Sequence, residues 1–250
     1  MNNNILSSFL IVLSFISIFP VPKKFFPEWN NNNLKFFCVM LPLVGIIFGV
    51  SWPLIFFVIS KLTKLSVIFK GFIMTLLTLS LTGGLHLDGF MDTCDAVFSH
   101  RDRETRLKIL SDTHSGAFAV MGCVIILMLK SFLFAEIFSH NFFTIALIPV
   151  YSRLGMGFLL NNMPFAKSDG LAVILGSSRN SHNNIFFALI FIILISLSSK
   201  IILITFIIIF ITWKNVCSKI FGGITGDLLG AFVEISEAFM LIGAVIEICI

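Results

Sequence analysis

The chain has 250 residues, of which 57% are hydrophobic and only 12% are charged. Soluble domains carry about 25% charged residues, so a chain this apolar cannot cover a water-exposed surface with polar groups. The formal charge of +4 comes from scattered Lys and Arg residues rather than a basic stripe with interleaved aromatic residues, which argues against a nucleic-acid partner. The composition therefore predicts that membrane lipid surrounds the protein.

Apolar segments follow one another along the chain, and a spanning helix needs about 20 mostly apolar residues. The first segment, Ile5–Phe19, is short and is expected either to span or only to dip into the bilayer. The stretch Ile185–Trp213 is too long for one crossing, and the polar residues around Ser198 predict a helical hairpin there. The other expected spans are Phe36–Ser60, Leu65–Leu85, Ala117–Ile137, Phe142–Leu160 and Ala231–Ile250. The expected fold is all-α, a polytopic membrane helix bundle of about seven or eight apolar segments that forms one domain over residues 1–250.

The distribution of basic residues predicts the orientation of the bundle. If the segment 20–35 is cytoplasmic, alternation also places segments 85–116, 161–184 and 214–230 on the inside. These four segments hold eleven of the 17 Lys and Arg residues. Cytoplasmic loops carry an excess of basic residues, so this orientation is favoured. It predicts a multi-pass membrane protein with its polar motifs on the cytoplasmic face.

Three aspartates lie in the segment LTGGLHLDGFMDTCDAVF, at residues 81–98. Asp88, Asp92 and Asp95 are spaced i, i+4 and i+7, which places them within an arc of about 60° on a helix. Carboxylates that share one face repel each other unless a cation lies between them. Oxygen ligands suit Mg²⁺, Mn²⁺ or Ca²⁺, and Mg²⁺ commonly combines one or two carboxylates with substrate phosphate oxygens. The pattern favours a metal and a phosphorylated ligand; the alternative is a solvated polar helix face.

Other polar and small residues flank this cluster. His86 is a candidate hydrogen-bond donor to phosphate or general acid–base, or else a structural hydrogen-bonding residue. Gly83 and Gly84 would let a ligand approach the backbone closely, or would only pack helices. The stretch 99–112 is expected to form a solvated surface helix. Asp112 at its end could cap the next helix or join the metal site.

Several segments together resemble the cobalamin synthase family, the adenosylcobinamide-GDP ribazoletransferases. The resemblance rests on GGLHLDGFMDTCDAVFS, followed by RDRETRLKILSD and GAFAV, on PVPKKFFPEW with LPLVGIIFG, and on FGGITGDLLGA followed by Glu234 and Glu237. It runs along nearly the whole chain. It implies transfer of the adenosylcobinamide phosphoryl group from adenosylcobinamide-GDP to α-ribazole or its 5′-phosphate, with release of GMP. It also implies Mg²⁺ as cofactor, corrinoid nucleotide and ribazole substrates, and other corrinoid-pathway enzymes as partners. The implied location is the bacterial cytoplasmic (inner) membrane.

Within this resemblance, Asp88, Asp92 and Asp95 are expected to hold Mg²⁺. Asp227 follows Gly226 in the TGD turn, and is expected to complete the metal site or act as base; its alternative is to cap the last helix. Gly226 is expected beside the substrate.

Two cations are candidate ligands of the substrate phosphates. Arg153 is expected to contact substrate phosphate because a cation within a span needs an anionic partner, and an Asp side chain is the structural alternative. Lys167 is a weaker phosphate-contact candidate and could equally be a solvated loop residue.

Two other functions fit some of these features. CDP-alcohol phosphotransferases use a comparable carboxylate helix, but their aspartate spacing differs and an Ala-Arg pair is missing here. A membrane cation transporter would carry acidic residues on several spans near the bilayer midplane. The acids of this chain gather at one expected interface, which favours an enzyme.

Overall fold

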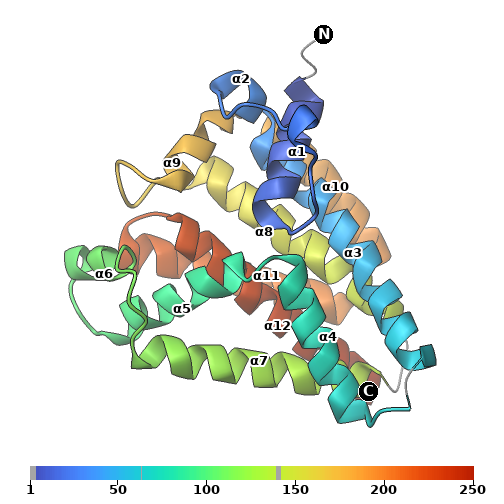
Figure 1. The fold of residues 1–250 in the computed structure, drawn as a ribbon. Helices are drawn as coiled ribbons and strands as arrows, with labels where there is room; N and C mark the ends of the chain where they lie inside the picture. Colours follow the sequence, from blue (N-terminus) through green and yellow to red (C-terminus); the bar gives the residue numbers. More distant parts are fainter. Residues whose placement is uncertain (1–3, 63, 139–141) are drawn as a thin grey trace.

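The computed structural model describes residues 4–62, 64–138 and 142–250. Their regular structure is helical throughout, so the all-α prediction is confirmed (Figure 1). Short 3₁₀ segments lie at Lys23–Phe25, Phe142–Leu147 and Gly176–Ser178, and a π-helical turn, Cys217–Phe221, extends α11. The α-helices are α1 (Asn4–Ile16), α2 (Asn31–Leu34), α3 (Phe37–Leu62), α4 (Val67–Leu81), α5 (Leu85–Phe98), α6 (Arg103–Ile109), α7 (Ala117–Ile137), α8 (Ile148–Asn162), α9 (Leu171–Leu175), α10 (Asn183–Leu197), α11 (Lys200–Val216) and α12 (Gly226–Cys249).

Within the described residues, 4 helical segments are long and apolar enough to cross a membrane, or up to 6 if each bent helix pair is one span. This is fewer than the number of apolar segments expected. Part of the difference arises because α8 and α10 have 15 residues each, or about 22 Å, which is short of the ~30 Å hydrocarbon core. The 4 segments are Phe37–Leu62, Ala117–Ile137, Lys200–Phe221 and Gly226–Cys249.

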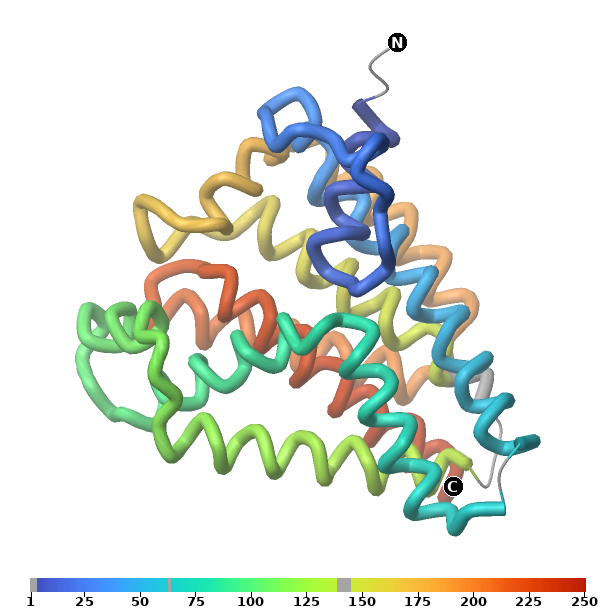
Figure 2. The backbone as a smooth tube through the Cα atoms, viewed as in Figure 1, coloured from blue at the N-terminus to red at the C-terminus, as the bar shows by residue number. Residues whose placement is uncertain are grey.

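The first helix does not cross from one end of the bundle to the other. Helix α1 has 13 residues, and the chain after it returns to the end from which α1 started (Figure 2). The Ser8 hydroxyl near the start of α1 donates to the Asn33 carbonyl at 2.6 Å, while Ile18 N donates to Leu81 O at 2.9 Å. The segment therefore dips into the bundle, which is one of the two expected outcomes.

A glycine pair breaks the expected span at residues 65–85. Gly83 and Gly84 have φ angles of 62° and 78°, in the left-handed region that a side chain disfavours. Helix α4 therefore ends at Leu81, and α5 leaves at an angle of 96° to it. The turn directs α5 along α7 and α12 instead of continuing the line of α4.

The predicted break within residues 185–213 is confirmed. Helix α10 ends at Leu197 and α11 begins at Lys200, with Ser199 as its N-cap. The Tyr151 hydroxyl on α8 lies 2.8 Å from Ser198 Oγ, which ties this turn to the bundle.

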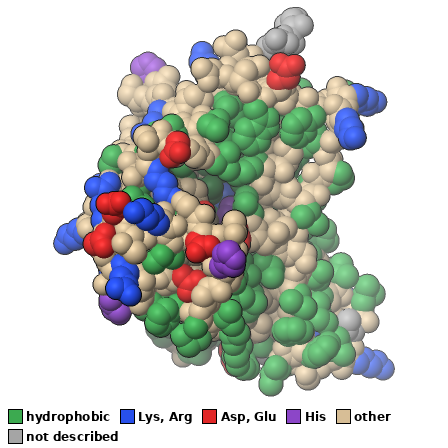
Figure 3. All heavy atoms as spheres, turned by 60° about the vertical axis from the view of Figure 1, so that its left-hand side comes forward, with side chains coloured by type: hydrophobic (Ala, Val, Ile, Leu, Met, Phe, Trp, Pro, Cys, Tyr) green, Lys and Arg blue, Asp and Glu red, His purple; other side chains and the backbone are tan. Residues whose placement is uncertain are grey.

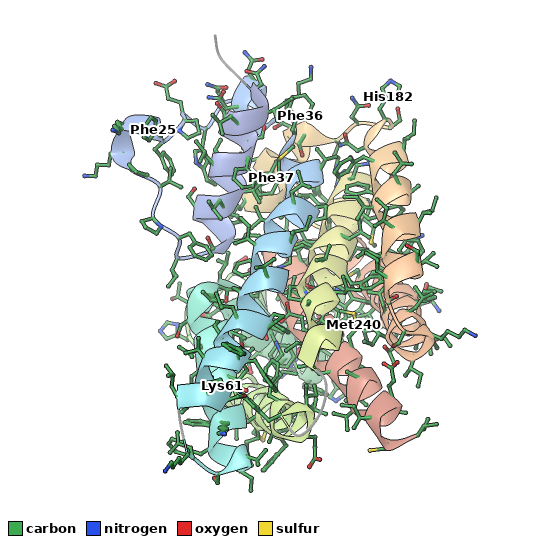
Figure 4. All side chains as sticks on the ribbon, turned by 90° about the vertical axis from the view of Figure 1, so that its right-hand side faces the viewer. Phe25, Phe36, Phe37, Lys61, His182 and Met240 are labelled. Atoms are coloured by element: carbon green, nitrogen blue, oxygen red, sulfur yellow. The ribbon has the colours of Figure 1, made fainter. Side chains whose placement is uncertain are left out.

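The polar segments gather at one end of the bundle. Figure 4 shows Phe25 on a projecting loop at the same end as Phe36 and His182, whereas Lys61 lies at the opposite end. Helices α3, α8 and α10 run side by side between these ends (Figures 1 and 4). The α6 and α9 helices and the start of α12 also lie at the polar end, so the sequence segments assigned to one membrane face lie together.

Four buried charges join α7, α8 and α12 inside the bundle. Lys130 Nζ lies 2.5 Å from Glu234 Oε2 and 3.1 Å from Glu237 Oε2. Glu237 also pairs with the Arg153 guanidinium, which donates to Ser152 Oγ at 2.9 Å. The four charged side chains are between 2% and 5% exposed, and two cations balance two anions. Each charge is costly in an apolar interior unless it is paired, so the pairs hold these three helices in register.

Replacing one member of this network is expected to destabilise the fold. Lys130→Met leaves Glu234 without its cation, and breaking a buried pair in this way costs about 3–5 kcal/mol. Thermal unfolding of the detergent-solubilised protein should show a lower midpoint for this variant. Lys61→Met, at an exposed position, is the matched control and should leave the midpoint unchanged. The double change Lys130→Met with Glu234→Gln should recover part of the loss, and a midpoint equal to that of Lys61→Met would contradict the proposed stabilisation.

Candidate functional site

A cavity of about 180 Å³ lies at the polar end, between α5, α8, α9 and the start of α12. Figure 3 shows charged side chains around a hollow at this end of the molecule. Its lining combines polar and apolar side chains. The polar ones are His86, Asp88, Lys167, Asp169, Thr225 and Asp227, and the apolar ones include Phe15, Met156, Leu175 and Leu229.

The close crossing of α5 and α12 brings two sequence motifs together. A Cβ atom on Gly89 would lie 2.8 Å from both Cα and O of Asp227, and one on Gly230 would lie 3.2 Å from the His86 carbonyl oxygen. Only glycine permits this approach without a shift of one helix. As a result Asp88 and Asp227, which are far apart in the sequence, line the same cavity.

Pairing between two loops forms another part of the cavity wall. Ala166 N donates to Ile224 O and Ile224 N donates to Pro164 O, each at 2.9 Å. This pairing fixes the segment after α8 against the segment before α12. Lys167 consequently lines the cavity with Asp227, and its Nζ atom also contacts Ser111 Oγ. Lys167, expected either to contact phosphate or to be a solvated loop residue, thus lies on the cavity wall, and its contact with phosphate stays a prediction.

The structure gathers four carboxylates near one another. Asp227 lies within electrostatic range of Asp88 and Lys167, and Asp92 within range of Asp88, Asp95 and Asp227. In the part of the chain that is described, no group of three His, Cys, Asp or Glu side chains is close enough to hold a metal ion by itself. The oxygen donors nevertheless suit Mg²⁺, which commonly takes one or two carboxylates and completes its shell with substrate phosphates and water.

Asp95 makes different contacts from those of the other two aspartates on α5. Its carboxylate accepts hydrogen bonds from Gly116 N at 2.6 Å and from Ala119 N at 2.9 Å, at the start of α7. A carboxylate there is favoured by the free backbone N–H groups and the helix dipole. Asp95 therefore links α5 to α7, and its predicted role as a metal ligand would have to use the lone pairs that its two carboxylate oxygens do not share with these N–H groups.

Asp112, which the sequence analysis named as a possible cap of α7, lies on the surface and pairs with His114. Its carboxylate is 2.8 Å from the His114 ring nitrogen Nδ1 and accepts from His114 N at 3.0 Å. These hydrogen bonds lower the pKa of the Asp112 carboxyl.

Asp227, likewise, is not the cap of α12, because the Thr225 side chain accepts from Leu228 N and takes that place.

His86 lies between the cavity and the interior of the bundle. It lines the cavity, yet the residue is only 1% exposed and its Nε2 atom has no hydrogen-bond partner within the described chain. A buried polar atom without a partner is uncommon and often marks a functional position. The catalytic role of His86 and its alternative as a structural hydrogen-bonding residue both stay predictions.

The predicted substrate-binding residues differ in whether they line the cavity. Arg153 is 2% exposed and pairs with Glu237 rather than lining the cavity, so its partner is an acidic side chain, as in the structural alternative, but a Glu instead of the expected Asp. Gly83 and Gly84 form the turn between α4 and α5, and neither lines the cavity. Gly226 does line it, at the first position of α12.

The sequence predictions missed several residues that line the cavity. Asp169 lies two residues after Lys167 in the same loop, and Thr225 lies two residues before Asp227, so proximity to a predicted residue was an available signal. Phe15 on α1 and Met156 on α8 gave no signal, because apolar residues within apolar segments are indistinguishable from ordinary packing residues.

Comparison with known proteins supplies independent information. A family profile described as "Cobalamin-5-phosphate synthase" matches residues 8–245. The chain is 34% identical over 247 residues to a protein of Geobacillus sp. (strain WCH70) named "Adenosylcobinamide-GDP ribazoletransferase", with 94% of this chain and 93% of the relative covered. Proteins of the same name from Lachnoclostridium phytofermentans and Clostridium perfringens (strain SM101) are 31% and 30% identical, covering 96% and 94% of this chain and 94% and 96% of theirs. No solved structure matches the chain.

The helix crossing gives a direct test of this site. Gly89→Ala would place a methyl group 2.8 Å from the Asp227 backbone, and such overpacking costs about 1–3 kcal/mol. The thermal midpoint of the purified variant is expected to fall. Gly226→Ala is the matched control for stability, because its Cβ atom would have nothing within 4 Å. Equal midpoints for the two variants would show that α5 and α12 do not cross as closely as described.

Proposed function

Because the chain belongs to the cobalamin-5-phosphate synthase family, we propose that it joins adenosylcobinamide-GDP to α-ribazole or its 5′-phosphate. The products are adenosylcobalamin or its phosphate, and GMP. This is a late step of cobalamin biosynthesis. The alternatives of a CDP-alcohol phosphotransferase and of a cation transporter have no support from the family match.

One observation carries this proposal beyond the family match. Asp88 from α5, Asp227 from α12 and Lys167 from the loop after α8 converge on one cavity at the polar end of a membrane bundle. Phosphoryl transfer depends mainly on positioning and on electrostatic stabilisation of phosphoryl oxygens. The two carboxylates can bind a divalent ion together with a phosphate group, and the Lys167 amine can bind phosphate oxygens. This combination supports phosphoryl transfer.

The reaction assigns separate tasks to these residues. A ribose hydroxyl of the acceptor attacks the phosphorus that is bonded to the cobinamide arm, a new P–O bond forms, and the bond to the GMP oxygen breaks. Asp88 and Asp92, one helical turn apart on α5, would hold Mg²⁺, which when bound neutralises charge on the diphosphate. Lys167 contacts phosphate oxygens. Asp227, on the opposing helix, accepts the proton of the attacking hydroxyl, and His86 hydrogen-bonds within the same site.

The membrane placement follows from the charge distribution. The four segments at the polar end hold eleven of the 17 Lys and Arg residues, which supports a cytoplasmic location for the cavity in a bacterial inner membrane. Soluble enzymes that handle corrinoids could then deliver substrate to the same face, so other enzymes of the pathway are proposed partners.

Removal of either cavity carboxylate is expected to stop turnover. Asp88→Asn weakens the metal site, and Asp227→Asn removes the proton acceptor, a change that typically costs at least about 100-fold. GMP release by the purified protein in liposomes, with both substrates present, measures the effect. Asp102→Asn is the control, because Asp102 caps α6 outside the cavity and asparagine caps equally well. Near-normal rates for both cavity variants would refute the assignment.

The proposed metal dependence has its own test. Chelation by EDTA should abolish GMP release by the wild-type protein, and added Mg²⁺ should restore it. The Asp88→Asn variant should need a higher Mg²⁺ concentration for half-maximal rate than Asp102→Asn does. Turnover that persists in EDTA would show that the carboxylates act without a metal.

A further inference from the structure

The cavity has two chemically different walls. The carboxylates of Asp88 and Asp227 and the amine of Lys167 belong to its polar wall. The apolar side chains of the lining, here called the apolar wall, include Phe15 of α1, Met156 of α8 and Leu229, which lies two residues beyond Asp227 on α12. Phosphate chemistry uses the polar wall and leaves the apolar wall without a function.

The Phe15 ring is held in place by other aromatic side chains. Its centroid lies 5.8 Å from that of Trp29, at an interplanar angle of 79°, and 6.1 Å from that of Phe37. Trp29 belongs to the segment that returns from α1, and Phe37 begins α3. The dip of α1 into the bundle therefore presents a supported aromatic ring to the cavity, whose lining also includes the flexible thioether of Met156, a group that favours contact with aromatic ligands.

We propose that this apolar wall binds the aromatic base of the ribazole acceptor and that Phe15 determines the specificity for that base, an inference that rests on the proposed function. The base of α-ribazole is a dimethylbenzimidazole, which is flat, largely apolar and has one unsubstituted ring nitrogen. Such a base loses little by leaving water and gains stacking and dispersion contacts with Phe15 and Met156.

The other large groups of the two substrates fit this wall less well. Guanine carries several donors and acceptors on its edges, and a wall of apolar side chains would leave them unpaired at a considerable cost. The corrin macrocycle is larger than most drug molecules, whose pockets measure about 300–1,000 Å³. The cavity measures about 180 Å³, so the macrocycle stays at its mouth. With the base on the apolar wall, the ribose and its hydroxyls lie toward Asp227.

Steady-state kinetics of the full chain in nanodiscs separate these assignments. Phe15→Ala should raise KM for α-ribazole by about tenfold, as expected for loss of one base–aromatic stack, while KM for adenosylcobinamide-GDP changes less than about twofold. Phe15→Trp should retain affinity for α-ribazole. Phe19→Ala is the matched control, since Phe19 packs against Phe48 and does not line the cavity. It should leave both KM values unchanged.

Two further measurements keep the proposal testable if Phe15→Ala does not fold. Phe15→Leu preserves apolar volume but removes the ring, and equilibrium dialysis with α-ribazole alone should show about tenfold weaker binding than the wild type. The same variant should also discriminate less between α-ribazole and a riboside with a purine base.

The outcomes distinguish this inference from the proposed function. A raised KM for adenosylcobinamide-GDP with an unchanged KM for α-ribazole would assign the wall to the nucleotide and overturn the inference. Unchanged values for both substrates in the Phe15 variants would also overturn it. Absence of GMP release by the wild-type protein would instead refute the proposed function itself.

Discussion

The close crossing of α5 and α12 is the constraint on which the site depends. Gly89 and Gly230 remove the side chains that would otherwise keep the two helices apart. Dispersion contacts and small residues, rather than a hydrophobic driving force, bring helices together in lipid. The crossing therefore does two things at once: it packs the bundle, and it places a carboxylate from each helix on one cavity. A larger residue at Gly89 would disturb both.

The buried ion pairs inside the bundle stabilise this arrangement. Helix α12 carries Asp227 at its first turn and Glu234 and Glu237 about two and three turns further into the bundle. The buried acids of this helix thus fix it to α7 and α8, while residues at its first turn line the cavity. Rigid support of this kind limits the movement of Asp227 relative to Asp88, and such positioning is what phosphoryl transfer requires of a protein.

Local sequence rules predicted some features of the site and missed others for identifiable reasons. The spacing of Asp88, Asp92 and Asp95 correctly predicted one helix, because helical periodicity is a local property. It could not show that the start of α7 would occupy Asp95, since that contact depends on a residue 21 positions away. The cost of a cation within a span predicted a partner for Arg153, but only the packing of α8 against α12 identifies that partner as Glu237.

The apolar residues illustrate a different limit. Phe15 and Met156 have nothing in their local pattern that separates them from packing residues, because the bilayer makes almost every position in these segments apolar. The number of spans was overestimated for a related reason. Hydropathy shows that a segment is stable in lipid. It does not show that Gly83 and Gly84 turn the chain, or that a helix is too short to cross the bilayer. The resemblance of whole motifs, by contrast, indicated the family that the comparisons then showed.

The buried ion pairs also constrain how the protein is made. Lys130 precedes Glu234 by 104 residues, so α7 and α8 leave the ribosome well before the acids that neutralise them. An unpaired cation within a span is costly, so neither Lys130 nor Arg153 has its final partner until α12 is synthesised. The pairing of α7 and α8 with α12 is therefore a late step in the assembly of the bundle.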